Sequence, residues 1–217
     1  MAEKSELTIM PMLYSKQLEG DVSTKAIMVT PYAVPLIQAY LALDTGVLYK
    51  SRVHGQGHIE RVMLLGAIIA RNEKLSTHEE RLLLLACAYH DIGRVDDSKD
   101  DAHGRRSAMM IKEKNLRDLT GDADDEELKA IQAAICTHSV HDDQLEANAK
   151  EFGVSEEYMP LCRKLCFCLK DADILDRVRL NDLDTKYLRH EKSVALKETA
   201  EYIFREYTRH AGEKTGA

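Results

Sequence analysis

Apolar residues recur at helical spacing over most of the chain from about Pro31 onward, and this pattern constrains the fold most strongly. Only four prolines and eleven glycines interrupt the 217 residues. The clearest apolar stripe lies within residues 57–72 and comprises Ile59, Val62, Met63, Leu65, Gly66, Ile69 and Ala70. The sequence therefore predicts an all-α protein in which the helices pack around a shared core.

Helix start and stop signals give approximate boundaries within this pattern. Thr77, followed by Glu79 and Glu80, predicts an oxygen-capped helix start, and Gly93 predicts its end. The expected helices cover residues 57–72, 77–91, 104 or 105 to 115, 126–138, 156–175 and 192–209. The first thirty residues are less regular, and we expect a short hairpin or an irregular arm there.

The length of the chain predicts one domain rather than two. We expect an N-terminal arm at 1–30, a single helical domain at 31–210 and a flexible tail at 211–217. No apolar run approaches the 18 residues or so that a membrane span needs, and the N-terminus is polar, so the sequence predicts a cytoplasmic protein with no membrane partner. A net charge of −7 argues against a nucleic acid polymer as partner.

Five cysteines are present, and three of them crowd one apolar segment. Cys162, Cys166 and Cys168 lack the paired Cys-x-x-Cys spacing of a zinc site. We expect them to be reduced core residues.

The pair His90-Asp91 ends an apolar stretch at residues 82–89 and points to bound cations. A histidine near a helix C-terminus can also interact with the helix dipole, while Asp91 caps a turn. That alternative leaves His58 and Asp173 without a role. With His103 and His138, these residues form a ligand set of nitrogen and oxygen atoms, which suits Mn, Fe, Co, Mg or Zn at a hydrolytic centre. We expect His78 at the surface, and the set excludes His54, His141, His190 and His210, which lie in polar or terminal settings.

The order His58, His90-Asp91, Asp173 resembles the H…HD…D signature of the HD superfamily of metal-dependent phosphohydrolases. The segments His58-Ile59-Glu60-Arg61-Val62, His90-Asp91-Ile92-Gly93-Arg94 and Ala172-Asp173-Ile174-Leu175-Asp176 carry the resemblance, which spans roughly residues 52–180. It implies the helical bundle of an HD domain, with one or two divalent metal ions. His58, His90, Asp91 and Asp173, rather than Asp171, would hold the first ion, and Asp91 would bridge to a second ion held by His103 and His138.

The same resemblance implies hydrolysis of a small phosphorylated substrate by metal-activated water, with Asp91 as the central catalytic residue. Developing negative charge on phosphoryl oxygens needs fixed cations, and Arg94, Arg105, Arg106 and Lys170 lie near the motifs. We expect Arg94 and Lys170 to bind phosphate and to assist catalysis, with at most one of Arg105 and Arg106 beside them. Each of the four could equally be a solvated surface charge. Arg61 and Arg177 are expected to pair with acidic groups such as Asp176.

Several functions remain open within this resemblance. A phosphohydrolase acting on a small nucleotide or related metabolite comes first, and a dinucleoside tetraphosphate hydrolase is the runner-up because Arg94 stands where a lysine is common. Cyclic-dinucleotide phosphodiesterases carry a Gly-Tyr-Pro motif that this chain lacks. A di-iron oxygenase would use the same six ligands, and a nucleotide-sensing module would bind without turnover. Apolar positions in the N-terminal arm, if exposed, would permit a homodimer.

Overall fold

A computed structural model describes residues 6–119 and 123–215 of the chain. The described residues form helices, turns and loops, with no strand among them, which confirms the predicted all-α class. The α-helices are α1 (Ile9–Tyr14), α2 (Val22–Met28), α3 (Ala33–Ala42), α4 (Gln56–Asn72), α5 (Thr77–Tyr89), α6 (His103–Glu113), α7 (Asp125–His138), α8 (Leu145–Phe152), α9 (Met159–Leu175), α10 (Glu191–Val194) and α11 (Lys197–Thr215).

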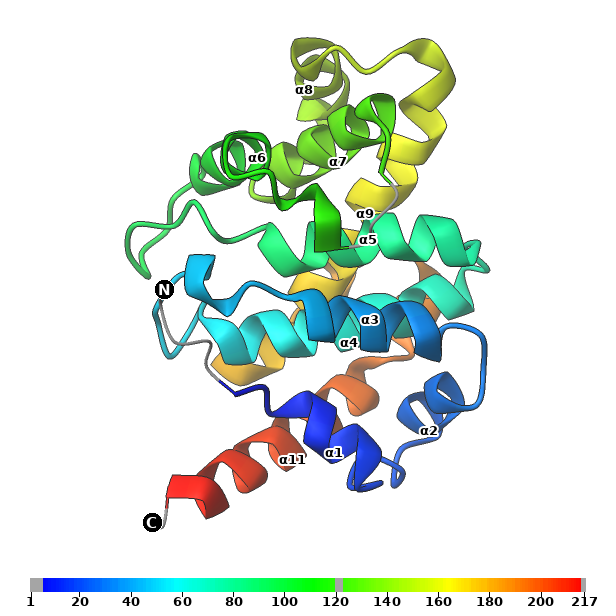
Figure 1. The fold of residues 1–217 in the computed structure, drawn as a ribbon, viewed down its shortest axis with the longest axis vertical. Helices are drawn as coiled ribbons and strands as arrows, with labels where there is room; N and C mark the ends of the chain where they lie inside the picture. Colours follow the sequence, from blue (N-terminus) through cyan, green and yellow to red (C-terminus); the bar gives the residue numbers. More distant parts are fainter. Residues whose placement is uncertain (1–5, 120–122, 216–217) are drawn as a thin grey trace.

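The bundle is built around α4 and α5, each of which has a long run of buried residues. Residues Ile59 to Ala70 of α4 and Leu82 to Tyr89 of α5 are buried without interruption. In Figure 1 these two helices cross the middle of the molecule, with α6, α7 and α8 at one end and α1, α2 and α11 at the other. Helix α9 packs against α4, α5 and α7, so the ends of α4, α5, α7 and α9 can contribute to one site.

Local capping explains where two of the core helices begin. Ser76 accepts a hydrogen bond from the backbone N–H of Glu79, and the Glu79 carboxylate accepts one from the backbone N–H of Ser76. Asp124 and Glu127 form the same reciprocal arrangement at the start of α7. The cap of α5 is therefore Ser76, one residue before the predicted Thr77.

The N-terminal arm differs from the sequence prediction, because its described residues form α1 and α2 rather than a hairpin. Ile9 and Met12 are buried against the core. The carboxylate of Glu60 on α4 accepts hydrogen bonds from the backbone N–H groups of Thr8 and Ile9, at 2.7 and 2.6 Å. Helix α1 is thus capped by a residue from another helix, which no local pattern in the arm could reveal.

The C-terminal region also differs from its prediction. The helix expected at 192–209 is divided into α10 and α11 by a turn at 195–196. Helix α11 continues to Thr215, into the segment predicted to be a flexible tail, and residues 216–217 lie outside the described part of the chain. Among the described residues, no helix is both long and apolar enough to cross a membrane.

All five cysteines are buried and free, which confirms the core placement expected for them. Burial raises the pKa of Cys162, Cys166 and Cys168 to about 12. The thiols therefore stay protonated at neutral pH and serve as core side chains.

Candidate metal centre

The structure brings together all six residues that the sequence nominated as metal ligands. His58 comes from α4, His90 and Asp91 follow α5, His103 begins α6, His138 ends α7, and Asp173 lies in the last turn of α9. The Nε2 atoms of His58 and His90 are 3.2 Å apart, and those of His103 and His138 are 2.9 Å apart. Asp173 Oδ1 lies 3.3 Å from His58 Nε2.

Asp91 lies between the two histidine pairs, and each of its carboxylate oxygens faces a different pair. Oδ1 is 3.0 Å from His103 Nε2 and 3.6 Å from His138 Nε2. Oδ2 is 3.6 Å from His58 Nε2 and 3.7 Å from His90 Nε2. Asp91 Oδ1 is buried and has no hydrogen-bond partner among the described residues. A buried carboxylate oxygen without a donor is costly unless a cation is bound there.

The histidines are held so that their Nε2 atoms face the centre of the site. His58 Nδ1 donates to Asp176 Oδ2 at 2.8 Å, His90 Nδ1 to the carbonyl of Cys87 at 2.9 Å, and His138 Nδ1 to the carbonyl of Ile135 at 2.6 Å. His103 Nδ1 pairs in the same way with the carbonyl of Asp100. When Nδ1 carries the proton of a neutral imidazole, Nε2 carries the lone pair. Four lone pairs therefore converge with two carboxylates, as metal binding requires.

Electrostatics in the centre favour neutral imidazole at His90 and charged carboxylates. Burial lowers the pKa of His90 to about 3, so that this histidine stays neutral. Burial alone would raise the pKa of Asp91, but His90 and His103 hold it well below its usual range. At His58, burial and Arg179 lower the pKa, but Asp173 and Asp176 outweigh them and raise it. Asp173 and Asp176 thus stabilise a proton on His58, so this part of the site favours positive charge.

His54 belongs to the cluster although the sequence analysis excluded it. Its Nδ1 lies 3.1 Å from Asp91 Oδ2, and His54, His58 and Asp91 offer atoms close enough to share one ion. The preceding turn is tight, because a Cβ atom at Gly55 would lie 2.1 Å from the carbonyl oxygen of Ser51. The four-residue spacing of His54 and His58 around this glycine is the signal that could have identified it.

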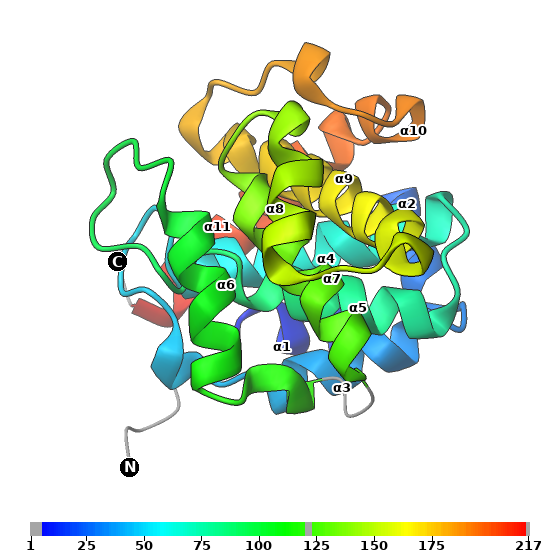
Figure 2. The ribbon, with the colours of Figure 1, turned by 90° about the horizontal axis from the view of Figure 1, so that it is seen from above.

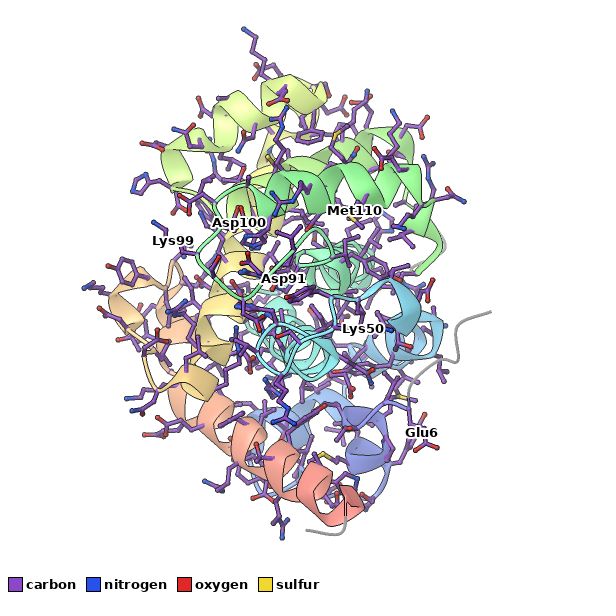
Figure 3. The ribbon with its side chains drawn as sticks, turned by 90° about the vertical axis from the view of Figure 1, so that its left-hand side faces the viewer. Glu6, Lys50, Asp91, Lys99, Asp100 and Met110 are labelled. Atoms are coloured by element: carbon purple, nitrogen blue, oxygen red, sulfur yellow. The ribbon has the colours of Figure 1, made fainter. Side chains whose placement is uncertain are left out.

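A cavity of about 570 Å³ opens onto the metal centre. His54, His103, His138 and Asp173 line its inner part, together with Arg94 and Arg177. Its outer wall is the loop between α5 and α6, which extends beside α6 at the edge of the bundle (Figure 2). Figure 3 shows Asp91 beside this loop, which carries Lys99 and Asp100. This volume lies in the range of small-molecule binding sites.

The four cationic side chains predicted to bind phosphate do not all line the cavity. Arg94 lines the cavity, and its Nε lies 2.9 Å from Asp91 Oδ2. Lys170 is instead buried outside the cavity, where it donates to the carbonyl of Val140 and to Asp142. Arg105 pairs with Glu151 at the surface, and Arg106 pairs with Asp100 and the carbonyl of Gly93. The structure therefore places Lys170, Arg105 and Arg106 in structural contacts, away from the lining of the cavity.

The remaining sequence-based predictions concern Arg61, Arg177 and Asp171. Arg61 pairs with Asp176 through two hydrogen bonds of 2.7 and 3.0 Å, as expected. Arg177 pairs with an acidic residue, Asp182, and also lines the cavity. Asp171 faces away from the centre and binds the backbone N–H groups of Arg189 and His190, which leaves Asp173 as the aspartate of α9 at the site.

Comparison with known proteins agrees with this geometry. A family model described as HD domain matches residues 55–178, which is more than half of the chain. Searches of curated proteins and of solved structures found no match. The matched segment contains all six clustered residues and the five helices that carry or adjoin them. HD domains are mostly metal-dependent hydrolases. The chain belongs to the HD domain family.

Proposed function

We propose that this protein is a metal-dependent phosphohydrolase that cleaves a phosphoester of a small nucleotide or related metabolite. The observation that carries the proposal is the pair of oxygens on Asp91, each facing a different pair of histidine Nε2 atoms. This arrangement fits a carboxylate shared by two divalent ions. Bound ions would supply an activated water molecule and polarise a phosphoryl oxygen.

The residues of the chain have distinct roles in the proposal. His58, His90 and Asp173 would hold one ion, His103 and His138 would hold the other, and Asp91 would be shared between them. Arg94 fixes Asp91 Oδ2 from the cavity side, where its guanidinium is also available to a phosphate. His54 lines the cavity and lies outside the predicted ligand set, so we assign it the transfer of a proton to the leaving oxygen.

The test is a metal-dependent screen with an inactive variant. Protein stripped of metal should be inactive, and Mn²⁺, Co²⁺, Fe²⁺, Mg²⁺ or Zn²⁺ should restore hydrolysis of at least one phosphomonoester, nucleotide or dinucleotide. Asp91→Asn should lose metal and turnover together, because an amide cannot supply two anionic oxygens. Phosphoester turnover by Asp91→Asn equal to that of the natural sequence would contradict the mechanism.

Asp171→Asn provides the matched control. Asp171 is as buried as Asp91 but holds backbone groups rather than the centre. Its substitution should lower the melting temperature while metal content and specific activity are retained. Equal loss of metal in both variants would mean that removing any buried carboxylate prevents metal binding. The assignment of Asp91 as the shared metal ligand would then be wrong.

A further inference from the structure

A second cavity, of about 480 Å³, lies between α11 and the segment that precedes α4. Arg52, Arg61 and Arg179 line it, and no aspartate or glutamate is among the lining residues. The chain as a whole carries a net charge of −7, so a cavity lined by three arginines and no carboxylate stands out against the rest of the surface. We propose that this cavity is a second binding site, specific for a small phosphate-type polyanion and separate from the metal centre.

The two inner arginines are fixed in place before any ligand arrives. Arg61 and Arg179 both donate to the buried carboxylate of Asp176, and the side chain of each is 5% exposed. The Arg61 guanidinium also lies over the rings of Phe204 and Tyr207, at 5.2 and 4.8 Å from their centroids. A guanidinium that is already ordered and partly shielded from water binds an anion with less loss of side-chain entropy.

The charges around the cavity leave a surplus of positive charge. Asp176 neutralises one of the two inner arginines. Arg52 is exposed at the rim, and among the described residues it has no hydrogen bond or ion pair. Two positive charges thus remain for a ligand. This balance favours a doubly or more highly charged phosphate over a neutral molecule.

The second cavity is distinct from the substrate cavity, although they are neighbours. Leu180 lines both, and Arg179 lies between them, with its Nη2 atom 3.3 Å from His54 Nδ1. None of the six residues of the metal centre lines the second cavity. Binding there therefore needs no metal, which separates this inference from the proposed function.

Pyrophosphate is a suitable probe, and the experiment is isothermal titration of the full chain after metal has been removed. We expect one pyrophosphate per chain, with the same affinity in Asp91→Asn. Arg52→Glu should weaken binding by about tenfold or more, because it reverses a charge at the rim. Thr208→Glu should do the same from the α11 side of the cavity.

The control is Lys50→Glu, an identical reversal at an exposed lysine that does not line the cavity. It should change the affinity far less than Arg52→Glu does. Arg52 and Lys50 are both exposed, so the fold should tolerate both substitutions. The proposal is overturned if the metal-free protein binds no pyrophosphate, or if Arg52→Glu and Lys50→Glu weaken binding equally.

Discussion

His54 combines contact with the metal centre and access to the cavity, whereas His58 and His90 are completely buried. If His54 delivers a proton to the leaving group, His54→Gln should reduce turnover of an alkyl phosphate by about 10²- to 10³-fold. The loss should be much smaller with p-nitrophenyl phosphate, because p-nitrophenolate leaves without a proton. Metal content, measured by elemental analysis, should be unchanged.

A matched control for His54 is His141→Gln, since the side chain of His141 is 83% exposed and lies outside the cavity. This variant should hydrolyse both the alkyl phosphate and p-nitrophenyl phosphate as fast as the natural sequence does. Loss of metal in His54→Gln, with an equal decrease on both substrates, would show that His54 is a ligand instead of a proton donor.

Glu80 is a completely buried carboxyl group on α5, and neither of its oxygens has a hydrogen-bond partner among the described residues. Burial raises its pKa from 4.5 to about 9. The folded state therefore keeps this proton while the unfolded state releases it above pH 4.5, so stability from this group falls as pH rises from about 4.5 to 9. Glu80→Gln should raise the free energy of unfolding by about 2 kcal/mol at pH 8 and by much less at pH 5.

Urea unfolding at the two pH values measures this difference. Glu79→Gln is the control on the same helix turn, because Glu79 caps α5 and pairs with Lys164, which lowers its pKa despite partial burial. That variant should be destabilised. A Glu80→Gln effect that is independent of pH would show that the carboxyl group is ionised in the folded protein.

The chemistry of individual residues explains which parts of the site could be predicted from the sequence. Imidazole and carboxylate groups beside apolar helices require partners, and the resemblance to the HD signature selected Asp173 rather than Asp171. All six nominated residues are clustered in the structure. Lys170 could not be placed, because its partners Val140 and Asp142 lie about thirty residues away in the chain. A lysine that binds phosphate and a lysine that forms a buried ion pair look alike in sequence.

At the scale of elements, the separation of α6 and α7 sets the distance between His103 and His138. A Cβ atom at Gly104 would lie 2.7 Å from the carbonyl oxygen of Ile135 and 3.0 Å from His138 Nδ1. Gly104→Ala should push these helices apart and disturb the His103–His138 half of the centre. We expect about half the metal content and a loss of turnover, with unchanged helical content by circular dichroism.

Gly212→Ala on α11 is the control, since an added Cβ there meets no atom within 4 Å. It should be neutral or slightly stabilising, because alanine favours helix more than glycine does. Full metal content in Gly104→Ala would contradict the idea that close packing of α6 on α7 maintains the second histidine pair.

The apolar stripes, lengths and capping of the helices explain why some could be predicted from the sequence and others could not. Helices α4, α5, α7 and α9 carry their own apolar stripes, α5 and α7 also have capping residues at their starts, and the ends of all four were expected within a few residues. Helix α1 has six residues and depends on Glu60 of α4 for its N-terminal hydrogen bonds. So short a helix is not stable alone, and its sequence therefore lacks a clear signal.

At the scale of the whole molecule, the metal centre ties together α4, α5, α6, α7 and α9. On its inner side the polar cluster packs against the apolar core of α4 and α5, whose low polarity strengthens electrostatic attraction for cations. Bound metal should therefore stabilise the fold as well as supply the chemistry.

In the proposed centre, Asp91 is shared by two metal ions. Anomalous diffraction from crystals grown with Mn²⁺ tests it directly, because the signal locates each ion relative to the side chains. We predict two peaks, one beside Asp91 Oδ1 between His103 and His138, and one beside Asp91 Oδ2 near His58, His90 and Asp173. Full Mn²⁺ occupancy elsewhere in the crystal with no peak beside Asp91 would show that Asp91 is not a metal ligand.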